Sequence, residues 1–444
     1  MKARQLLPLA LFAIASFAPA QEAQFKQLSL FEAVSFAMKN SPTLRAAQAE
    51  IDAARAETGV ARSRTRPQLS INGFASQGSM PNILQSAMGV EPQALILAPE
   101  KGFLDGNLML MAPLYTGGWL SGLVAAASAR EQAAIAEASG MRAEVALKVR
   151  EAYTRALYGV ELVKAQQARV TAAEAMVRNA QALFEAGKGI EASVRRAEAE
   201  LADAKRELTM AENERRKTLL DLLAEMGAAL DSPVTLTETL EYKPVEGTLE
   251  AYLGIAMQTR GELIAARQRA RAGQGQVSSA EGALRPQVYG FAMGDAFAPR
   301  DLMGKNSGYT VGLTVSLPVF DGGMRRSEVA GARAMRERAL ADVARLELQT
   351  AKEVRQAWLD IETAAENYRS AQAGLVAAQA AYEVMVVRVE SGKGILVEQL
   401  DALAALTRAR ANLAQATYDH QLAIAKLYRA VGQVDARATG GISQ

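Results

Sequence analysis

The residue types that most often carry protein chemistry are scarce in this chain. It has one histidine, His420, and no cysteine. His420 lies inside a helical pattern, with no second histidine and no thiol to share a metal or to activate a nucleophile. The sequence therefore predicts no metal site, no cofactor and no Ser–His or Cys–His catalysis, so we do not expect an enzyme.

Two acids are the strongest candidates for a functional pair. Glu398 and Asp401 are three residues apart at the start of a helical run, so they share one face of that helix. A simpler explanation is also open, because the helix dipole by itself favours acids in a first turn. A related segment earlier in the chain has Ser193 and Arg196 at the matching positions.

The acids follow a short corner that occurs twice. The corner reads "AGKGI" at 186–190 and "SGKGI" at 391–395. We expect Gly187 and Gly392 to take the left-handed conformation that closes a helix. Gly189 and Gly394 are expected to relax the start of the next helix. Each corner therefore predicts a tight antiparallel helical hairpin.

The other residues of the corners are a cation and an apolar side chain. Lys188 and Lys393 lie where a positive charge favours the carbonyl end of the preceding helix. Ile190 and Ile395 place an apolar group at the end of each hairpin. They could contact a partner protein or could only staple the tip.

Further matches show that the corners belong to a tandem duplication. Matching pairs at one offset are "VREAY" (149–153) with "VRQAW" (354–358), "PLYTGG" (113–118) with "PVFDGG" (318–323), and "MG" (226–227) with "VG" (431–432). "RPQL" (66–69) and "RPQV" (285–288) match at a larger offset, so the extra residues lie in one loop between Pro67 and Pro113.

Each half predicts the same elements in the same order. These are short helices at about 29–39 and 248–259, helices at 42–65 and 261–284, two strands per half, long helices at about 120–185 and 325–390, and return helices that end at Gly227 and Gly432. Each long helix would be roughly 100 Å long at 1.5 Å per residue. No ordinary globular domain has that dimension.

Four segments have the length of strands. "YTVGLTVSLPVF" (309–320) alternates, with Tyr309, Val311, Leu313, Val315 and Leu317 on one side. The segments 68–73, 107–115 and 287–294 alternate less strictly. All are close to the length of a tilted membrane strand. Four strands cannot close a membrane barrel, so several chains must pool them, or the strands form a soluble sheet.

A glycine pair follows the second strand of each half. Gly117 and Gly118, and likewise Gly322 and Gly323, stand between a strand and a long helix. They do not belong to a phosphate-binding loop of the strand–GxxxxGK[ST]–helix type. We expect them to let the chain turn from strand to helix.

The N-terminus has the pattern of an export signal. Residues 1–20 contain Lys2 and Arg4, an apolar core and "APA", so cleavage is expected between Ala20 and Gln21. No later stretch is long and apolar enough to predict a membrane-spanning helix. The chain has 50 basic and 48 acidic residues, a balance that argues against nucleic-acid binding.

These features together resemble the TolC family of outer-membrane efflux proteins, of the cysteine-free, non-lipoprotein type. The resemblance covers about residues 28–433 and depends on the order of the duplicated motifs, from "RPQ" and the glycine pairs to "GKGI" and "LVEQLDA". It implies a mainly α fold with a small β part. The long hairpins of three chains would form a trimeric α-barrel, and their strands a twelve-stranded transmembrane β-barrel. Residues 228–242 and the two short helices would form a belt around the α-barrel.

The resemblance also implies function and site residues. The protein would be a homotrimeric duct in the outer membrane, with a large periplasmic portion and no nucleic-acid partner, in a tripartite efflux or type I secretion system. Its partners would be a periplasmic adaptor, an inner-membrane transporter and outer-membrane lipid. Glu398 and Asp401 would ring the periplasmic aperture, where six carboxylates repel one another unless the mouth stays wet or binds cations. Residues 187–190 and 392–395 would contact the adaptor.

The expected organisation is a signal peptide (1–20), a first repeat (21–246), a second repeat (247–436) and a disordered tail (437–444). One alternative is a protein with the same long helices but no channel activity. An exported, elongated coiled-coil scaffold or tether would need no apolar stripe opposite Thr310, Thr314 and Ser316.

Overall fold

A computed structural model describes residues 27–76, 103–299 and 306–434. The predicted cleavage site at Ala20 and Gln21 and the predicted tail at 437–444 lie outside the described residues. The chain folds into two compact units. Unit 1 contains Met1–Ser41, Lys148–Lys243 and Ala364–Leu422, and unit 2 contains Pro42–Leu147, Pro244–Thr363 and Ala423–Gln444. Each unit therefore draws on both halves of the sequence.

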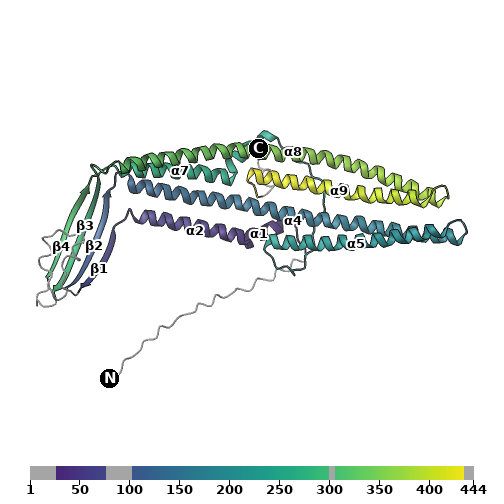
Figure 1. Cartoon of the computed structure of the whole chain (residues 1–444), viewed down its shortest axis with the longest axis horizontal. Helices are drawn as coiled ribbons and strands as arrows, with labels where there is room; N and C mark the ends of the chain where they lie inside the picture. The colour runs from purple at the N-terminus through teal and green to yellow at the C-terminus, as the bar shows by residue number, and fades with distance from the viewer. Residues whose placement is uncertain (1–26, 77–102, 300–305, 435–444) are drawn as a thin grey trace, which may run out of the picture. The chain divides into compact units, whose positions relative to one another are not determined.

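The two halves have the same elements in the same order (Figure 1). The first half contains α1 (Leu30–Asn40), α2 (Pro42–Ser63), β1 (Gln68–Ser76), β2 (Phe103–Tyr115), α4 (Trp119–Glu185) and α5 (Glu191–Met226). The second contains α6 (Leu249–Thr259), α7 (Gly261–Gly282), β3 (Gln287–Pro299), β4 (Asn306–Ser316), α8 (Met324–Glu390) and α9 (Leu396–Val431). Paired helices have equal lengths of 11, 22, 67 and 36 residues. The predicted mainly α fold with duplicated hairpins is confirmed.

The strands differ most from the prediction. The predicted strand 309–320 is wrong at its end, because β4 stops at Ser316. Pro318 follows, and proline has no backbone N–H to donate to a strand ladder. The other three strands run beyond their predicted C-terminal or N-terminal limits. Glycines interrupt the alternation of apolar and polar residues in these segments, but the strands continue to pair through them.

Unit 1 contains α1, α5 and parts of α4, α8 and α9. α1 begins with a capping box, in which the Ser29 hydroxyl accepts from the Glu32 N–H and Glu32 accepts from the Ser29 N–H. Close to the two corners, Met176, Val194 and Leu403 pack in one apolar cluster with side chains of α4, α5, α8 and α9. This cluster joins the first hairpin to the second.

Unit 2 contains the sheet and the helices that lead into it. The four strands lie in the order β1-β2-β3-β4, and every neighbouring pair is antiparallel. α7 lies very close to α4, since a Cβ on Gly275 would be 2.6 Å from the Ala126 nitrogen. A second apolar cluster combines α6, α8 and α9 around Val354 and Leu427. Within the described residues, no helix is both long enough and apolar enough to cross a membrane.

Candidate functional site

The corner between α8 and α9 closes by a glycine in the left-handed region. Gly392 has φ +73. Its N–H donates to the Val389 carbonyl at 3.0 Å, and the Lys393 N–H donates to the Arg388 carbonyl at 2.8 Å. These two bonds form a Schellman motif, which pairs the last carbonyls of the helix.

The corner between α4 and α5 has the same geometry. Gly187 has φ +71, and its N–H donates to the Phe184 carbonyl at 2.9 Å. The Lys188 N–H donates to the Leu183 carbonyl at 2.9 Å. The prediction of two matching hairpins, each closed by a left-handed glycine, is confirmed.

The second glycine of each corner acts differently from the prediction. Gly189 and Gly394 are outside the positive-φ set, so they do not relax the backbone. Instead they lie against the helix that has just ended. A Cβ on Gly189 would be 3.0 Å from the Phe184 nitrogen, and one on Gly394 would be 3.1 Å from the Arg388 Cβ. The tight approach of the chain favours glycine there.

The tips expose both cations and apolar groups. Lys188 and Lys393 are exposed. Ile190 is 66% exposed and Ile395 is 62% exposed. The isoleucines are therefore not buried as a staple within the described part of the chain, and each hairpin ends in a small surface with an apolar centre and a positive charge.

The acidic pair lies just beyond the second tip. Glu398 and Asp401 are both exposed, whereas Gln399 and Leu403 on the other side of α9 are 4% and 2% exposed. This alternation puts the two carboxylates on the open face of a helix held by the apolar cluster. Neither carboxylate has an ion-pair or hydrogen-bond partner among the described residues.

The first hairpin presents a different charge at its tip. Arg196 is exposed and Ser193 is partly buried at the positions that match Asp401 and Glu398. Arg195 pairs with Glu191 at 3.2 Å and with Glu198 at 3.1 Å. The two tips thus share a backbone and differ in charge.

The glycine pairs are where the strands turn into the long helices. Gly117, Gly118, Gly322 and Gly323 have φ of +61, +101, +66 and +91. All four therefore occupy a region that side-chain-bearing residues rarely adopt. Asp321 accepts from the Gly323 N–H at 3.0 Å in the turn and from the Arg325 N–H of the first turn of α8 at 3.3 Å, so it caps that helix. The structure agrees with their predicted role as turns.

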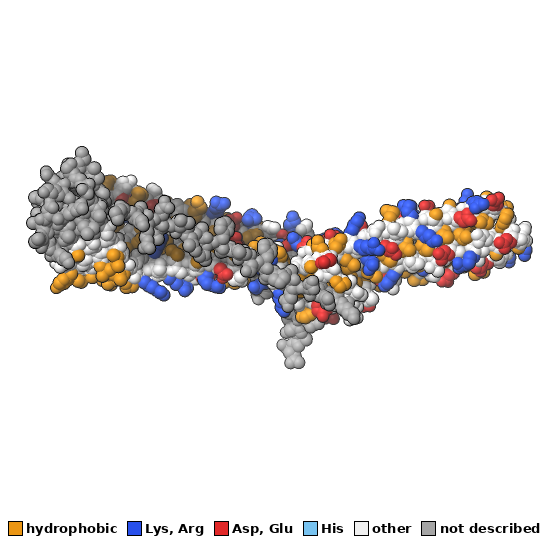
Figure 2. All heavy atoms as spheres, turned by 90° about the horizontal axis from the view of Figure 1, so that it is seen from below, with side chains coloured by type: hydrophobic (Ala, Val, Ile, Leu, Met, Phe, Trp, Pro, Cys, Tyr) orange, Lys and Arg blue, Asp and Glu red, His pale blue; other side chains and the backbone are white. Residues whose placement is uncertain are grey.

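The register of the sheet aligns one apolar face across all four strands. Ile71 pairs with Leu108, Leu108 with Gly294, and Gly294 with Tyr309. The next row on the same face is Leu69, Leu110, Ala292 and Val311. The large residues of both rows are exposed, from 39% for Leu110 to 85% for Tyr309. Figure 2 shows hydrophobic side chains gathered on the sheet and charged ones spread over the helices.

The opposite face of the sheet is more polar. Ser70, Asn72, Asn107, Thr310 and Thr314 belong to it by the same register. The Asn72 amide donates to the Asn107 side-chain oxygen at 2.9 Å. Met109, Met293 and Phe291 lie on this face as well, so it is mixed rather than wholly polar. A sheet with one apolar face and one more polar face fits a wall between lipid and water.

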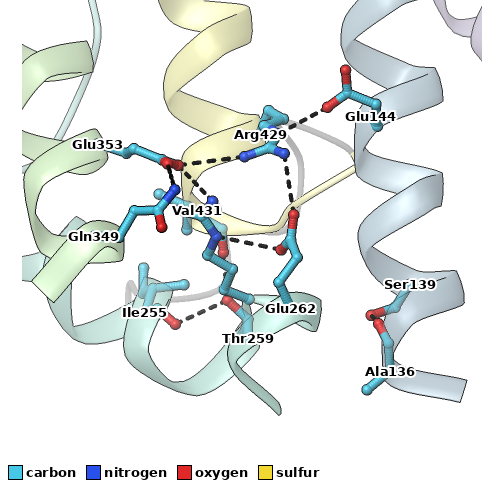
Figure 3. A network of polar contacts seen from close by, with 11 residues as sticks. Ala136, Ser139, Glu144, Ile255, Thr259, Glu262, Gln349, Glu353, Arg429 and Val431 are labelled. Atoms are coloured by element: carbon cyan, nitrogen blue, oxygen red, sulfur yellow. Dashed lines mark hydrogen bonds and ion pairs between the residues drawn. The ribbon is translucent and has the colours of Figure 1, made fainter. Parts of the chain in front are cut away.

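One cluster of charged residues gave no signal in the sequence analysis. In unit 2, five charged residues of α4, α7, α8, α9 and the α6–α7 junction form a network (Figure 3). They are Glu144, Arg260, Glu262, Glu353 and Arg429. Arg260 is 4% exposed. Burial raises the Glu353 pKa, but bonds from Gln349 and Arg260 outweigh it and lower the pKa overall.

The described residues offer no metal-binding group of three or more His, Asp or Glu side chains. His420 is 1% exposed, and neither ring nitrogen has a hydrogen-bond partner in the described part of the chain. Burial lowers its pKa. The features that remain are surfaces: two tips, one acidic pair and one two-faced sheet.

Comparisons with known proteins agree on one family. The family model described as outer membrane efflux protein matches residues 33–228 and 253–433, one segment in each half. No curated protein matches the chain.

Solved structures show how far the fold is shared. The outer-membrane channel OprN has a TM-score of 0.76 and 21% identity, and the match covers 93% of this chain and 94% of that one. The outer membrane protein VceC from Vibrio cholerae has a TM-score of 0.75 and 19% identity, with 91% and 96% covered. CusC has a TM-score of 0.77 and 15% identity, with 94% and 97% covered. At these identities the likeness shows a common fold along nearly the whole chain.

Proposed function

Since the chain belongs to the outer membrane efflux protein family, as its resemblance predicted, we propose that it is the exit duct of a tripartite efflux or type I secretion system. The outer membrane is then its location, and its helical hairpins extend into the periplasm. Substrates pass from an inner-membrane transporter, through a periplasmic adaptor, into this duct. The duct performs no covalent chemistry, so substrate choice belongs to the transporter.

The open, two-faced sheet is the observation that carries this proposal. β1 and β4 are its edges, and unpaired edge groups cost several kcal/mol each in lipid. The large residues of the apolar face are exposed on β1, β2 and β4. Three copies would pair β4 of one chain with β1 of the next and would close twelve strands with no edge. The same three copies would bring twelve long helices into one α-barrel.

The acidic pair gives the duct its proposed aperture. Six carboxylates, Glu398 and Asp401 from three copies, would face one opening. Their exposure and their lack of partners in the described chain support this placement. A ring of acids favours cations and resists tight closure.

The two tips are the proposed adaptor contacts. Their exposed isoleucines lie beside backbone held rigid by the Schellman bonds. An adaptor surface with a complementary apolar pocket would bind without reordering the chain. We propose that the chain is divided into two repeats, 21–246 and 247–436, and that each repeat contributes one of the two tips.

Assembly state tests the proposal directly. Outer membranes solubilised in mild detergent should contain the protein as a cross-linkable trimer. The alternative of a scaffold or tether predicts a soluble periplasmic monomer, and that result would refute the duct.

Single-channel recording tests the aperture. In a planar bilayer, replacing Glu398 and Asp401 together by alanine should lower cation selectivity and weaken block by divalent cations. The matched control replaces Ser193 and Arg196, the corresponding residues of the first hairpin, and should keep the cation block. Unchanged selectivity in the acid variant would place the constriction elsewhere.

A further inference from the structure

A strap of extended chain, residues 228–243, follows α5 within unit 1. Its first part is attached to the N-terminal segment and the first hairpin. The Leu28 N–H donates to the Thr235 carbonyl at 2.9 Å, and the Thr237 N–H donates to the Leu28 carbonyl at 3.1 Å. The Tyr153 hydroxyl of α4 also donates to the Leu28 carbonyl, at 3.0 Å.

The second part of the strap is attached to the second hairpin by an aromatic stack. The Tyr242 ring lies between Tyr368 of α8, with centroids 4.4 Å apart, and His420 of α9, with centroids 4.3 Å apart. The Gln421 amide donates to the Glu241 carbonyl at 2.6 Å. The strap therefore connects the two hairpins of unit 1. His420 is one of the residues of the second hairpin that hold it.

His420 is poorly placed to carry a charge. It is 1% exposed, and both ring nitrogens lack partners among the described residues. The carboxylates next to Tyr242 and next to His420 in sequence already accept hydrogen bonds from other side chains. The Glu241 carboxylate accepts from the Thr239 hydroxyl at 2.6 Å, and the Asp419 carboxylate accepts from the Gln415 amide at 2.8 Å.

Other ionisable side chains surround the stack. Tyr158 of α4 packs against Tyr418 of α9, and the space beside the Tyr242 ring is lined by Glu161 and Lys164 of α4, Glu241 of the strap and Arg410 of α9. Burial lowers the pKa of the His420 imidazole, because it disfavours the charged form.

The stack also has room to open. A cavity of about 630 Å³ lies beside it, lined by Tyr242, Tyr368, Leu240, Arg410 and neighbouring residues of α4 and α9. This space adjoins the Tyr242 ring, so a displaced ring would have room beside the stack.

We propose that His420 makes the strap an acid-released link between the two hairpins: protonation of the buried imidazole expels Tyr242 from the stack and frees the strap from α8 and α9. This device belongs to unit 1 and does not depend on the proposed transport role. The released imidazole gains water, which supplies the hydrogen bonds that both nitrogens lack.

The sign of the effect follows from linkage. Above about pH 6.5 the imidazole is neutral in both the stacked and the released state, so the stack keeps its full stability. Below that pH only the released state binds the proton. The ratio of released to stacked strap should rise about tenfold per pH unit until the lowered pKa of the stacked state is reached.

The single histidine allows a direct measurement. In the full chain, purified through a histidine-free tag and placed in lipid vesicles, ¹⁵N-labelled histidine gives the signal of His420 alone by solid-state NMR. The expected midpoint of titration is below 6.5. A midpoint at or above 6.5 would overturn the proposal.

The absence of cysteine allows a second measurement on the strap itself. A spin label on Lys243→Cys, an exposed strap position, should become mobile as pH falls from 8 to 4.5, with the midpoint found by NMR. His420→Phe keeps an aromatic ring and cannot bind a proton, so its label should stay immobile throughout. An immobile wild-type label, different midpoints for the two signals, or the same transition in His420→Phe would each refute the device.

Discussion

Replacing Arg260 tests whether the charge network of unit 2 stabilises the fold. Arg260 is 4% exposed, and its Nη2 lies 2.5 Å from Glu353. Arg260→Met keeps the apolar stem and removes the charge. Breaking a buried ion pair typically costs about 3–5 kcal/mol. Glu353 keeps Arg429 at 3.4 Å and is 29% exposed, so we expect a smaller loss, about 2–3 kcal/mol of unfolding free energy.

An unpartnered atom also limits this loss. The second terminal nitrogen of Arg260, Nη1, is buried and has no acceptor in the described chain. Its desolvation already weakens the native state, and Arg260→Met removes that cost together with the charge. The expected loss of unfolding free energy in Arg260→Met is therefore below the range of about 3–5 kcal/mol that is typical of broken buried pairs.

The assay is guanidinium unfolding in detergent, followed by the helical circular dichroism signal. A double-mutant cycle with Glu353→Gln should give a coupling free energy of about 1–2 kcal/mol. The matched control is Arg333→Met, because Arg333 pairs with Glu281 at 2.7 Å between α8 and α7 but is 62% exposed. That variant should lose no more than about 1 kcal/mol.

Equal losses in Arg260→Met and Arg333→Met would refute this reasoning. They would mean that the desolvation of Arg260 cancels its attraction to Glu353 and Glu262. A coupling free energy of zero between Arg260 and Glu353 would have the same meaning, even if each single variant is unstable. The outcome matters because Arg429 of α9 pairs with Glu144, Glu262 and Glu353, which belong to α4, α7 and α8; Figure 3 shows these contacts.

Three further predictions use the same preparations. Gly392 has φ +73 and open space around it, so Gly392→Ala should destabilise the protein by about 1–2 kcal/mol. The control Gly374→Ala, in the exposed interior of α8, should stabilise it by about 0.5–1 kcal/mol. Equal effects of the two substitutions would contradict the left-handed cap. Val311→Arg on the apolar face should cost about 2–4 kcal/mol and reduce membrane insertion, while Thr310→Arg on the other face should insert normally, as judged by trimer recovered from membranes. Because the Glu353 pKa is lowered from 4.5, its stabilisation is present above about pH 4.5 and is lost as pH falls through the folded-state pKa; the unfolding midpoint of Glu353→Gln should change less than that of the wild type in this window.

Much of the helical fold could be predicted because its signals are local. Alanine-rich runs favour long helices, and the return helices end at Gly227 and Gly432 as expected, with both glycines in the left-handed region. The strands were harder to predict. In β3, Gly290 and Gly294 occupy positions on the apolar face and contribute no side chain, so the alternation is visible only once Leu108 and Tyr309 are known to flank Gly294.

The polar networks could not be predicted from local patterns at all. Arg260, Glu353 and Arg429 lie far apart in sequence and meet only because α6, α8 and α9 pack around Val354 and Leu427. The aromatic stack has the same character, since nothing near Tyr242 in sequence indicates His420. The tips and the acidic pair were predictable because each is a short motif whose spacing carries its geometry.

The two repeats have the same backbone elements, but the residues proposed to have a function are concentrated in α9. It carries Glu398 and Asp401 in its first turns and His420 further along, about 30 Å away at 1.5 Å per residue. A rigid helix transmits a displacement at one end to the other, provided that its packing partners yield. The apolar cluster around Leu403 includes Leu396 and Leu400, so it holds the segment of α9 that carries the acidic pair against the first hairpin. Release of the strap would therefore reach the proposed aperture only if this cluster yields. If the cluster holds, His420→Phe will leave the conductance unchanged at every pH while its strap stays immobile.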